Sequence, residues 1–365
     1  MNALAQELAE LIRQDGPISI SRYMALCLGH PGHGYYMKQY PFGADGDFTT
    51  APEISQIFGE LIGIWAASVW QAMGAPDSIR LVELGPGRGT LMQDMLRAAR
   101  ALPGFRDALS VHLVETSPVL RERQRQTLAS SGTAPQWHDR IEQALDGPAI
   151  AVANEFLDAL PLDQFVRTPE GWRERLVGLH GEGGLAFGLA AEPDTSLSVA
   201  APANSVLEQP AAALETVALV ARHVATQGGA GLFIDYGPAH SGFGDTLQAL
   251  KRHAFVDVLA EPGDADLTVH VDFARMAQAG LAAGAAVHGA VAQRDFLLAL
   301  GLRQRFEALV RRATEAQGEA LARGVERLIE TGPTAMGELF KVLAVADPKL
   351  PLLPGFDLHR LPEQG

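Results

Sequence analysis

Residues 79–90, IRLVELGPGRGT, combine a short apolar run with three closely spaced glycines. An apolar run of this length that ends at glycine is typical of a buried strand in a parallel sheet. Glycine lets the backbone turn tightly and approach a bound molecule closely. A helix that begins after the turn offers unpaired N–H groups to a carboxylate or a phosphate. The stretch therefore predicts strand, turn and helix, with or without a ligand at the turn.

Two common nucleotide-binding motifs do not fit this turn. The dinucleotide fingerprint G-x-G-x-x-G needs a glycine where this chain has Thr90. A P-loop needs a lysine followed by serine or threonine, and no such lysine follows Gly89. The spacing E-x-G-x-G-x-G that begins at Glu83 instead resembles motif I of the class I S-adenosylmethionine methyltransferases.

Further short apolar runs predict more buried strands, at residues 111–115, 136–138, 149–154, 231–236 and 340–346. Helical patterns separate several of them, at residues 91–101, 119–128 and 214–225. Strands that alternate with helices predict an α/β fold with a doubly wound parallel sheet. Before the first strand, residues 52–70 carry apolar side chains at helical spacing and predict one helix.

The same patterns predict how the chain is organised. We expect a helical N-terminal region at 1–76, with a loop at 41–53, followed by an α/β domain at 77–350. Alternating residues and turn signals at about 162–208 predict antiparallel hairpins, and charged periodic residues at about 290–330 predict helices. Residues 351–365 form a proline-rich tail.

Composition excludes several classes of protein. The chain has 365 residues, 47% of them hydrophobic, and a net charge of −14, which argues against a general nucleic-acid-binding surface. The single cysteine, Cys27, allows no internal disulfide, and neither the cysteine nor the histidines form a metal-binding pattern. No apolar stretch reaches the roughly 18 residues needed to cross a bilayer. We expect no metal, no nucleic-acid partner, no membrane insertion and a cytoplasmic location.

Polar side chains follow the expected strands, where the carboxyl ends of a parallel sheet meet and ligands bind. A carboxylate after the second strand, Glu115, can accept both hydroxyls of a ribose. Another acid, Asp139, is a candidate partner for an adenine amine. The next strand ends are followed by Asn154, Glu155 and Asp235. Helix capping, packing or a solvated surface position is the alternative explanation for each of these residues.

Several fragments, taken in order, resemble the MidA-like S-adenosylmethionine-dependent methyltransferases, the family of the mitochondrial complex I assembly-factor arginine methyltransferase. The fragments are GDFTTAPEISQIFGELIG, VELGPGRGTLMQD, ANEFLDALP, IDYG, DLTVHVDF and MGELFKVL. They span about residues 15–345. The resemblance implies a class I, Rossmann-like fold whose seven-stranded sheet has an antiparallel last strand. It also implies S-adenosylmethionine as cofactor and arginine methylation of a complex I core subunit, which in eukaryotic relatives takes place in the mitochondrial matrix.

The resemblance also assigns a cofactor site. Glu83 would face the methionine ammonium, and the other residues assigned to the cofactor around the strand ends are Gly85, Pro86, Gly87, Gly89, Thr90, Glu115, Asp139 and Asn154. The fragment that includes residues 46–53 moves to the active site. Its residues Phe48, Thr50, Pro52 and Glu53 would lie over the cofactor.

A substrate guanidinium needs a carboxylate to orient it and to stabilise charge during transfer. Glu155 is the first candidate, with Asn154 orienting it, and Asp235 and Glu53 are further candidates. The expected partner is a protein substrate, and the expected assembly is a homodimer. A SAM-binding assembly chaperone without catalysis and a small-molecule N- or O-methyltransferase remain alternatives.

Overall fold

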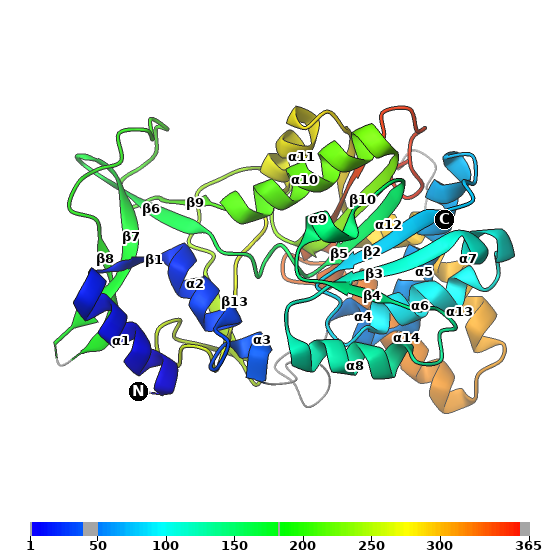
Figure 1. Ribbon diagram of the computed structural model, residues 1–365, viewed down its shortest axis with the longest axis horizontal. Coiled ribbons are helices and arrows are strands. Elements are labelled where there is room, and N and C mark those ends of the chain that lie inside the picture. The colour runs from blue at the N-terminus through cyan, green and yellow to red at the C-terminus, as the bar shows by residue number, and fades with distance from the viewer. Residues whose placement is uncertain (1, 39–49, 182, 358–365) are drawn as a thin grey trace. The chain divides into compact units, whose positions relative to one another are not determined.

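The computed structural model describes residues 2–38, 50–181 and 183–357 (Figure 1). The chain forms two compact units, each assembled from three separate segments. The first unit comprises Met1–Phe48, Asp158–Glu215 and Ser241–His270, and the second comprises Thr49–Leu157, Thr216–His240 and Val271–Gly365. The domain limits expected after residues 76 and 350 remain predictions.

The second unit contains a seven-stranded sheet in the order β14-β15-β10-β5-β2-β3-β4. Its strands are β2 (Ile79–Leu84), β3 (Leu109–Val114), β4 (Gln136–His138), β5 (Ala149–Asn154), β10 (Gly229–Tyr236), β14 (Ala286–Ala292) and β15 (Phe340–Ala346). The last strand, β15, is antiparallel to both of its neighbours, whereas the pairs from β10 to β4 are all parallel. The predicted α/β class and its antiparallel last strand are confirmed.

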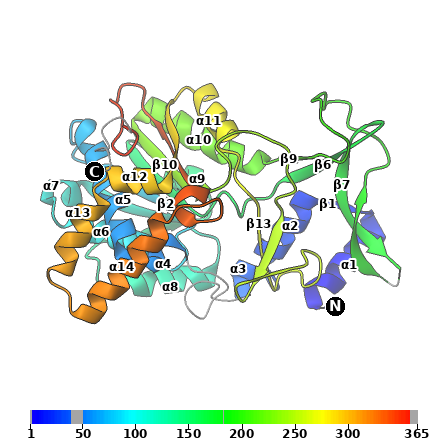
Figure 2. The ribbon, with the colours of Figure 1, turned by 180° about the vertical axis from the view of Figure 1, so that it is seen from behind.

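Helices cover both faces of this sheet (Figures 1 and 2). They are α4 (Ala51–Ile54), α5 (Gln56–Ala72), α6 (Thr90–Ala99), α7 (Pro103–Ala108), α8 (Pro118–Leu128), α9 (Ile141–Ala144), α10 (Ala211–Gln227), α11 (Phe273–Ala282), α12 (Gln293–Ala299), α13 (Leu302–Val310), α14 (Glu315–Ile329) and α15 (Met336–Leu339). Alternate strand residues such as Leu81, Ile150 and Leu232 join one buried cluster with α5, α6 and α12. On the other face a Cβ at Gly231 would lie 2.6 Å from Val220 Cγ1, so α10 packs directly on β10.

The helix predicted at 52–70 is wrong as a single element, because the chain breaks at Ser55. This residue is extended, with φ −156° and ψ 129°, and its hydroxyl accepts the N–H of Ile57 at 3.3 Å. A serine at this position caps the helix that follows, because its side chain satisfies one of the unpaired N–H groups. The apolar periodicity continues through the break, so it could not reveal the separate turn α4.

The first unit contains a five-stranded antiparallel sheet, formed by β1 (Ile18–Ser19), β6 (Asp163–Thr168), β7 (Gly171–His180), β8 (Gly184–Leu189) and β9 (Val206–Gln209). A smaller sheet contains β11 (Gln248–Lys251), β12 (Ala254–Val256) and β13 (Asp266–Thr268). The helices are α1 (Ala3–Asp15), α2 (Ile20–Gly29) and α3 (Tyr35–Lys38). Among the described residues of the whole chain, none of the helices is both long and apolar enough to cross a membrane.

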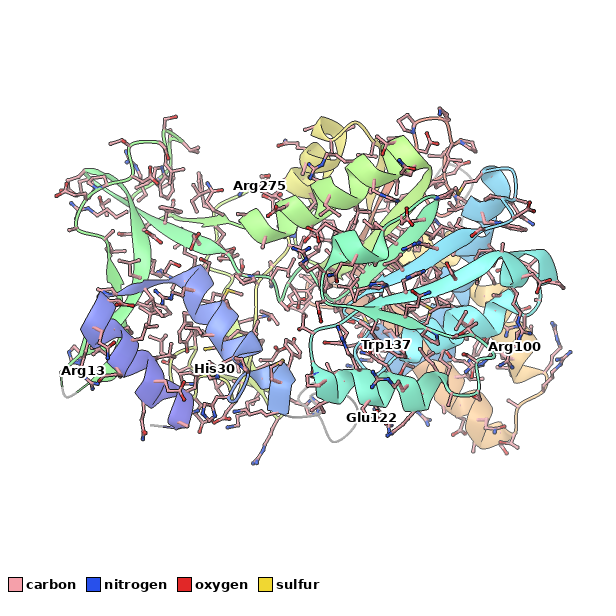
Figure 3. All side chains as sticks on the ribbon, viewed as in Figure 1. Arg13, His30, Arg100, Glu122, Trp137 and Arg275 are labelled. Atoms are coloured by element: carbon pink, nitrogen blue, oxygen red, sulfur yellow. The ribbon has the colours of Figure 1, made fainter. Side chains whose placement is uncertain are left out.

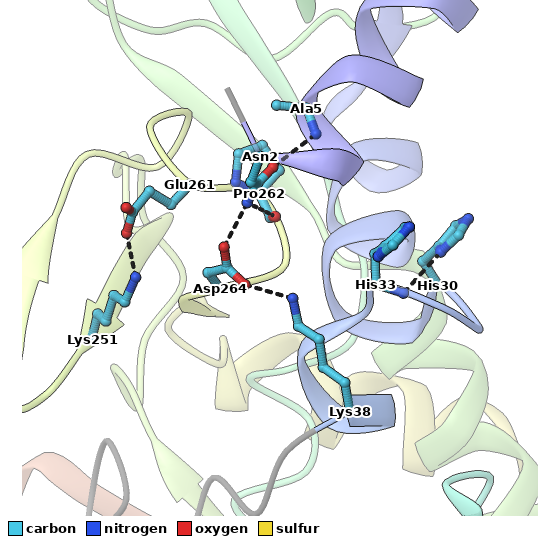
Figure 4. Close-up of polar contacts among 9 residues, drawn as sticks. All are labelled: Asn2, Ala5, His30, His33, Lys38, Lys251, Glu261, Pro262 and Asp264. Carbon is cyan, nitrogen blue, oxygen red and sulfur yellow. Dashed lines mark hydrogen bonds and ion pairs between the residues drawn. The ribbon is translucent and has the colours of Figure 1, made fainter.

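Asn2 ties the start of α1 to a loop far along the chain (Figure 4). Its Oδ1 accepts the N–H of Ala5 at 2.9 Å, while its Nδ2 donates to Pro262 O at 2.9 Å and to Asp264 Oδ2 at 2.7 Å. Lys38 donates to the other oxygen of Asp264. The N-cap and the ion pair therefore fasten the N-terminal helices to residues 262–264 within the first unit.

A buried ionic cluster joins three helices of the second unit. The Glu60 carboxylate of α5 is 1% exposed; it accepts from Arg305 Nε of α13 at 2.8 Å and lies 3.6 Å from Arg97 NH1 of α6. Arg97 also pairs with Asp94 at 2.7 Å. Burial is the main cause that raises the pKa of Asp94 to about 7. Glu60 thus links α13 to α5 and α6.

We expect Glu60→Ala to lower the free energy of unfolding by about 2 kcal/mol, because Arg305 loses its buried partner and Arg97 keeps only Asp94. The loss stays below that of a fully buried pair, since the Arg305 side chain is 36% exposed and can be hydrated. Glu319→Ala is the matched control, because Glu319 and Arg323 form an exposed pair whose loss costs less than about 0.5 kcal/mol. Urea denaturation measures both, and equal effects would contradict the assignment.

Candidate functional site

The glycine turn after β2 has the conformation that its sequence suggests. Gly85, Gly87 and Gly89 have φ values of +62°, +52° and +82°. A Cβ at Gly85 would lie 2.6 Å from Phe156 Cδ2, so a side chain is excluded there by both conformation and space. The turn is closed by Gly89 N, which donates to Pro86 O at 2.7 Å.

The turn leads directly into helix α6. Gly89 occupies the N-cap and has no side chain that could accept the first N–H groups of this ten-residue helix. One of these groups, the N–H of Met92, donates to the carboxylate of Glu83. The positive end of the helix dipole lies at the same place. The end of α6 is therefore suited to an anionic group such as a carboxylate.

Glu83, at the end of β2, is a buried carboxylate with an unpartnered oxygen. The residue is 3% exposed, and one of its oxygens accepts the backbone N–H of Met92. Among the described residues, Oε2 has no hydrogen-bond partner. Burial raises the pKa of Glu83 to about 8. Such a group favours a cationic partner, which would compensate the ionised carboxylate.

The segment that precedes α5 is bonded to the glycine turn. Glu53 of α4 accepts the Thr90 hydroxyl at 2.6 Å on Oε1 and pairs with Arg88 NH1 at 3.4 Å through Oε2. Pro52 is a buried residue of α4, and at the start of this helix the carbonyl of Thr50 accepts the N–H of Glu53 at 2.9 Å. The structure therefore bonds Glu53 to residues of the glycine turn, and Thr50 and Pro52 belong to the same short helix as its N-cap and a buried residue. The fourth predicted residue of this segment, Phe48, lies outside the described residues.

Asn154 and Glu155 follow β5 and interact with the same segment. Glu155 Oε1 accepts the N–H of Ala51 at 3.1 Å and the Nδ2 of Asn154 at 3.0 Å. Glu155 has φ +50°, a conformation that non-glycine residues seldom adopt and that often marks a functional position. Burial raises its pKa. Asn154 Oδ1 is buried and has no hydrogen-bond partner in the described part of the chain.

Asp235, at the end of β10, fixes the backbone after Glu155. Its Oδ2 accepts the N–H groups of Phe156 at 3.2 Å and Leu157 at 2.9 Å. Its Oδ1 accepts the N–H of Tyr236 at 2.9 Å, and the residue is 1% exposed. These bonds hold Phe156 in the position where its ring lies on Gly85. Asp235 therefore lies close to Glu155, another residue that the sequence singled out. Both oxygens of its carboxylate accept hydrogen bonds from backbone N–H groups.

Glu115, after β3, is joined to the glycine turn through Gln124 and is 9% exposed. Its Oε1 accepts the N–H of Ser117 at 2.8 Å, and its Oε2 accepts Gln124 Nε2 at 3.2 Å. The same Nε2 donates to Gly87 O at 2.8 Å. Burial raises the pKa of Glu115.

Asp139 is set apart from this group. Its side chain is 71% exposed and pairs with Arg121 NH2 at 2.7 Å, while the Nε of Arg121 donates to Glu115 O at 2.7 Å. The side chain of Asp139 is thus linked to Glu115 through Arg121.

The sequence did not draw attention to Phe156, Arg121 or Gln124. One signal for Gln124 was present, because it interrupts an apolar stripe between Leu120 and Leu128 on α8. A polar residue in such a stripe is buried and needs partners.

Together these residues favour a zwitterionic ligand with hydroxyl groups. The remaining N–H groups at the start of α6 suit an anionic group, Glu83 suits a cation, and Glu115 suits a diol. Within residues 2–38, 50–181 and 183–357, no cluster of three or more histidine, cysteine, aspartate or glutamate side chains is arranged to hold a metal ion.

Comparisons with known proteins agree with this geometry. The sequence profile of a family of S-adenosyl-L-methionine-dependent methyltransferases matches residues 61–291. A Danio rerio protein named protein arginine methyltransferase NDUFAF7, mitochondrial, is 38% identical over 94% of this chain and 86% of its own. The Homo sapiens protein of that name is 36% identical over 92% of this chain and 81% of its own.

A solved structure also resembles the whole chain. It is a Burkholderia thailandensis protein crystallised with S-adenosyl-homocysteine, which matches with a TM-score of 0.83 at 31% sequence identity. The match covers 97% of this chain and 94% of that one. The likeness therefore extends over both units.

The burial of Glu83 predicts a pH dependence of stability in the protein without ligand. Between pH 4.5, its ordinary pKa, and about 8, the unfolded chain releases this proton and the folded chain retains it. The wild type should therefore lose stability relative to Glu83→Gln as the pH rises through this window, and the difference should be constant above it. Urea denaturation of both proteins across the window measures it. A difference that does not change with pH would show that Glu83 ionises normally.

Proposed function

Because the chain belongs to the family of S-adenosyl-L-methionine-dependent methyltransferases, we propose that it methylates an arginine of a protein substrate. The proposed substrate is a subunit of respiratory complex I or its bacterial counterpart, as the sequence resemblance implies. The observation that carries the proposal is the Glu155 carboxylate, held after β5 by Ala51 and Asn154. The names of the relatives, protein arginine methyltransferase, support the same substrate class.

S-adenosylmethionine supplies an electrophilic methyl group on a sulfonium sulfur. In the proposed reaction a guanidinium nitrogen of the substrate forms the new N–C bond, the C–S bond electrons leave on sulfur, and the nitrogen loses one proton. The residues of this chain must align the nitrogen with the methyl group and stabilise charge. A carboxylate paired with the guanidinium does both, through charge-assisted hydrogen bonds.

Glu155 is the proposed catalytic carboxylate. Both of its donors bind Oε1, and within the described part of the chain Oε2 makes no hydrogen bond, so it can receive a substrate N–H group. Asn154 orients Glu155 through its amide nitrogen, and its unpartnered Oδ1 is a second acceptor at the same strand end. Its raised pKa lets Glu155 accept the released proton more readily than an exposed carboxylate.

The remaining candidates take positioning or cofactor roles in this proposal. Asp235 and Glu53 hold the loops after β10, β5 and β2, because their oxygens already bind N–H, hydroxyl or guanidinium groups. Glu83 would pair with the methionine ammonium, and the end of α6 would bind the carboxylate. Residues proposed to contact the rest of the cofactor are Gly85, Pro86, Gly87, Gly89, Thr90, Glu115, Asn154, Phe48, Thr50, Pro52 and Asp139, the last after release from Arg121.

Location and assembly belong to the same proposal. The relatives NDUFAF7 are named mitochondrial, whereas the structural relative comes from a bacterium. We propose a bacterial cytoplasmic protein that acts as a homodimer. Cell fractionation and light scattering test these two points separately.

Glu155→Gln should reduce methyl transfer by about 100-fold or more, because glutamine keeps an acceptor for Ala51 but cannot take a proton. Binding of S-adenosyl-homocysteine, measured by calorimetry, should change by less than about threefold, since the substitution leaves the glycine turn intact. Glu122→Gln, an exposed residue of α8, is the matched control with full activity. A fully active Glu155→Gln protein would show that Glu155 is not the catalytic carboxylate.

The methylated residue is identified with S-adenosylmethionine labelled in its methyl group. Proteins extracted from cells lacking this enzyme are incubated with it, hydrolysed and separated into amino acids. Label in methylarginine is expected. Label in lysine, in a carboxyl ester or only in small molecules contradicts the proposal, and so does intact cofactor binding without any transfer, which would favour a non-catalytic assembly chaperone.

A further inference from the structure

Gln124 is a fully buried amide at the centre of the cofactor side of the site. It lies on α8, is 0% exposed, and uses both ends of its side chain. Its Nε2 donates to Gly87 O at 2.8 Å and to Glu115 Oε2 at 3.2 Å. Its Oε1 accepts the indole N–H of Trp137 at 2.8 Å, and Figure 3 shows Trp137 beside α8.

The neighbours of Gln124 fix which way its amide points. An indole N–H can only donate, so the atom facing Trp137 must be the amide oxygen. The two N–H groups of the amide then face the carbonyl of Gly87 and the carboxylate of Glu115, which can only accept when ionised. Because each of the three partners is satisfied only in this orientation, the side chain is locked.

A glutamine at this position is not explained by packing. Its neighbours on the same face of α8, Leu120 and Leu128, are buried apolar residues, and a leucine or methionine would continue their stripe. Burying an amide is favourable only when its hydrogen bonds are made, so Gln124 adds little to stability beyond an apolar side chain. What an apolar residue could not do is hold Glu115 and Gly87 together.

The locked amide restrains both oxygens of Glu115. Ser117 N binds Oε1, Gln124 binds Oε2 and the N–H of Thr116 also donates to the carboxylate, so the carboxylate cannot rotate. A carboxylate offers about four lone-pair sites, so it can still accept a ligand hydroxyl. The same nitrogen holds the glycine turn at a fixed distance from that carboxylate. A diol bound by Glu115 would thus lie at a fixed distance from the part of the ligand that binds the glycine turn.

We propose that Gln124 is a positioning residue that determines how strongly the protein recognises the ribose hydroxyls of S-adenosylmethionine. It acts through Glu115 and the glycine turn, without touching the cofactor itself. This inference rests on the proposed role of Glu115 as the ribose acceptor. It assigns no catalytic role to Gln124.

Calorimetry with two probes tests the inference, S-adenosyl-homocysteine and its 2′-deoxyribose counterpart. Gln124→Met keeps length and burial but removes the amide. We expect it to weaken S-adenosyl-homocysteine binding about tenfold more than deoxy-probe binding, the effect of one hydrogen bond to a charged group, because a loosened glycine turn affects both probes alike. The preference for the ribose probe should therefore disappear. Equal weakening of both probes, or no weakening, would overturn the inference.

Three further variants complete the design. Gln126→Met makes the same substitution on an exposed site of α8 and should bind both probes like the wild type. Trp137→Phe removes only the hydrogen bond to the amide oxygen of Gln124 and should reduce the preference for the ribose probe partially. This variant replaces Gln124→Met as the test if Gln124→Met does not fold. An unchanged preference in Trp137→Phe would then contradict the inference. Glu115→Gln separates the two claims: if it retains the full ribose preference, the role of Glu115 is wrong and the inference falls with it.

Discussion

The ring of Phe156 lies on Gly85, and this contact joins the two strand ends on which the site is built. No side chain can occupy position 85, because its Cβ would lie 2.6 Å from the ring and the backbone is left-handed there. Phe156 is in turn held by the carboxylate of Asp235. The glycine is therefore required by the protein's own packing, before any ligand is considered. A backbone that approaches so closely is also one that a cofactor can approach.

The buried carboxylates near this contact differ in how many hydrogen-bond donors stabilise their negative charge. Asp235 accepts three backbone N–H groups, which stabilise its charge. Glu83 and Glu155 have fewer donors, and burial raises the pKa of each. The first arrangement makes a rigid support, and the second leaves acceptors whose charge is incompletely compensated. A methyltransferase with a cationic cofactor gains from the second kind, because the ligand supplies the missing positive charge.

Local sequence patterns were sufficient for the elements that depend on local chemistry. The apolar runs predicted β2, β5 and β15, and the glycine spacing predicted the turn before α6. The break at Ser55 was missed because the apolar stripe runs through it. Strand β14 was missed because its residues are rich in alanine and glycine and gain their strand conformation only by pairing with β15. The partners of Asp235 and Gln124 are backbone groups and side chains far along the chain, and no pattern within one segment can reveal them.

The position of β15 has a consequence for how the protein is made. This strand lies between β10 and β14, yet it follows the other six strands of the sheet along the chain. Until it has been synthesised, the edge of β10 presents the N–H and C=O groups of an apolar strand without their eventual neighbour. Unpaired edges of this kind invite association with other chains during synthesis. Completion of the sheet is thus postponed until β15 has been synthesised, and a nascent chain that stalls after α14 would expose the unpaired edge of β10.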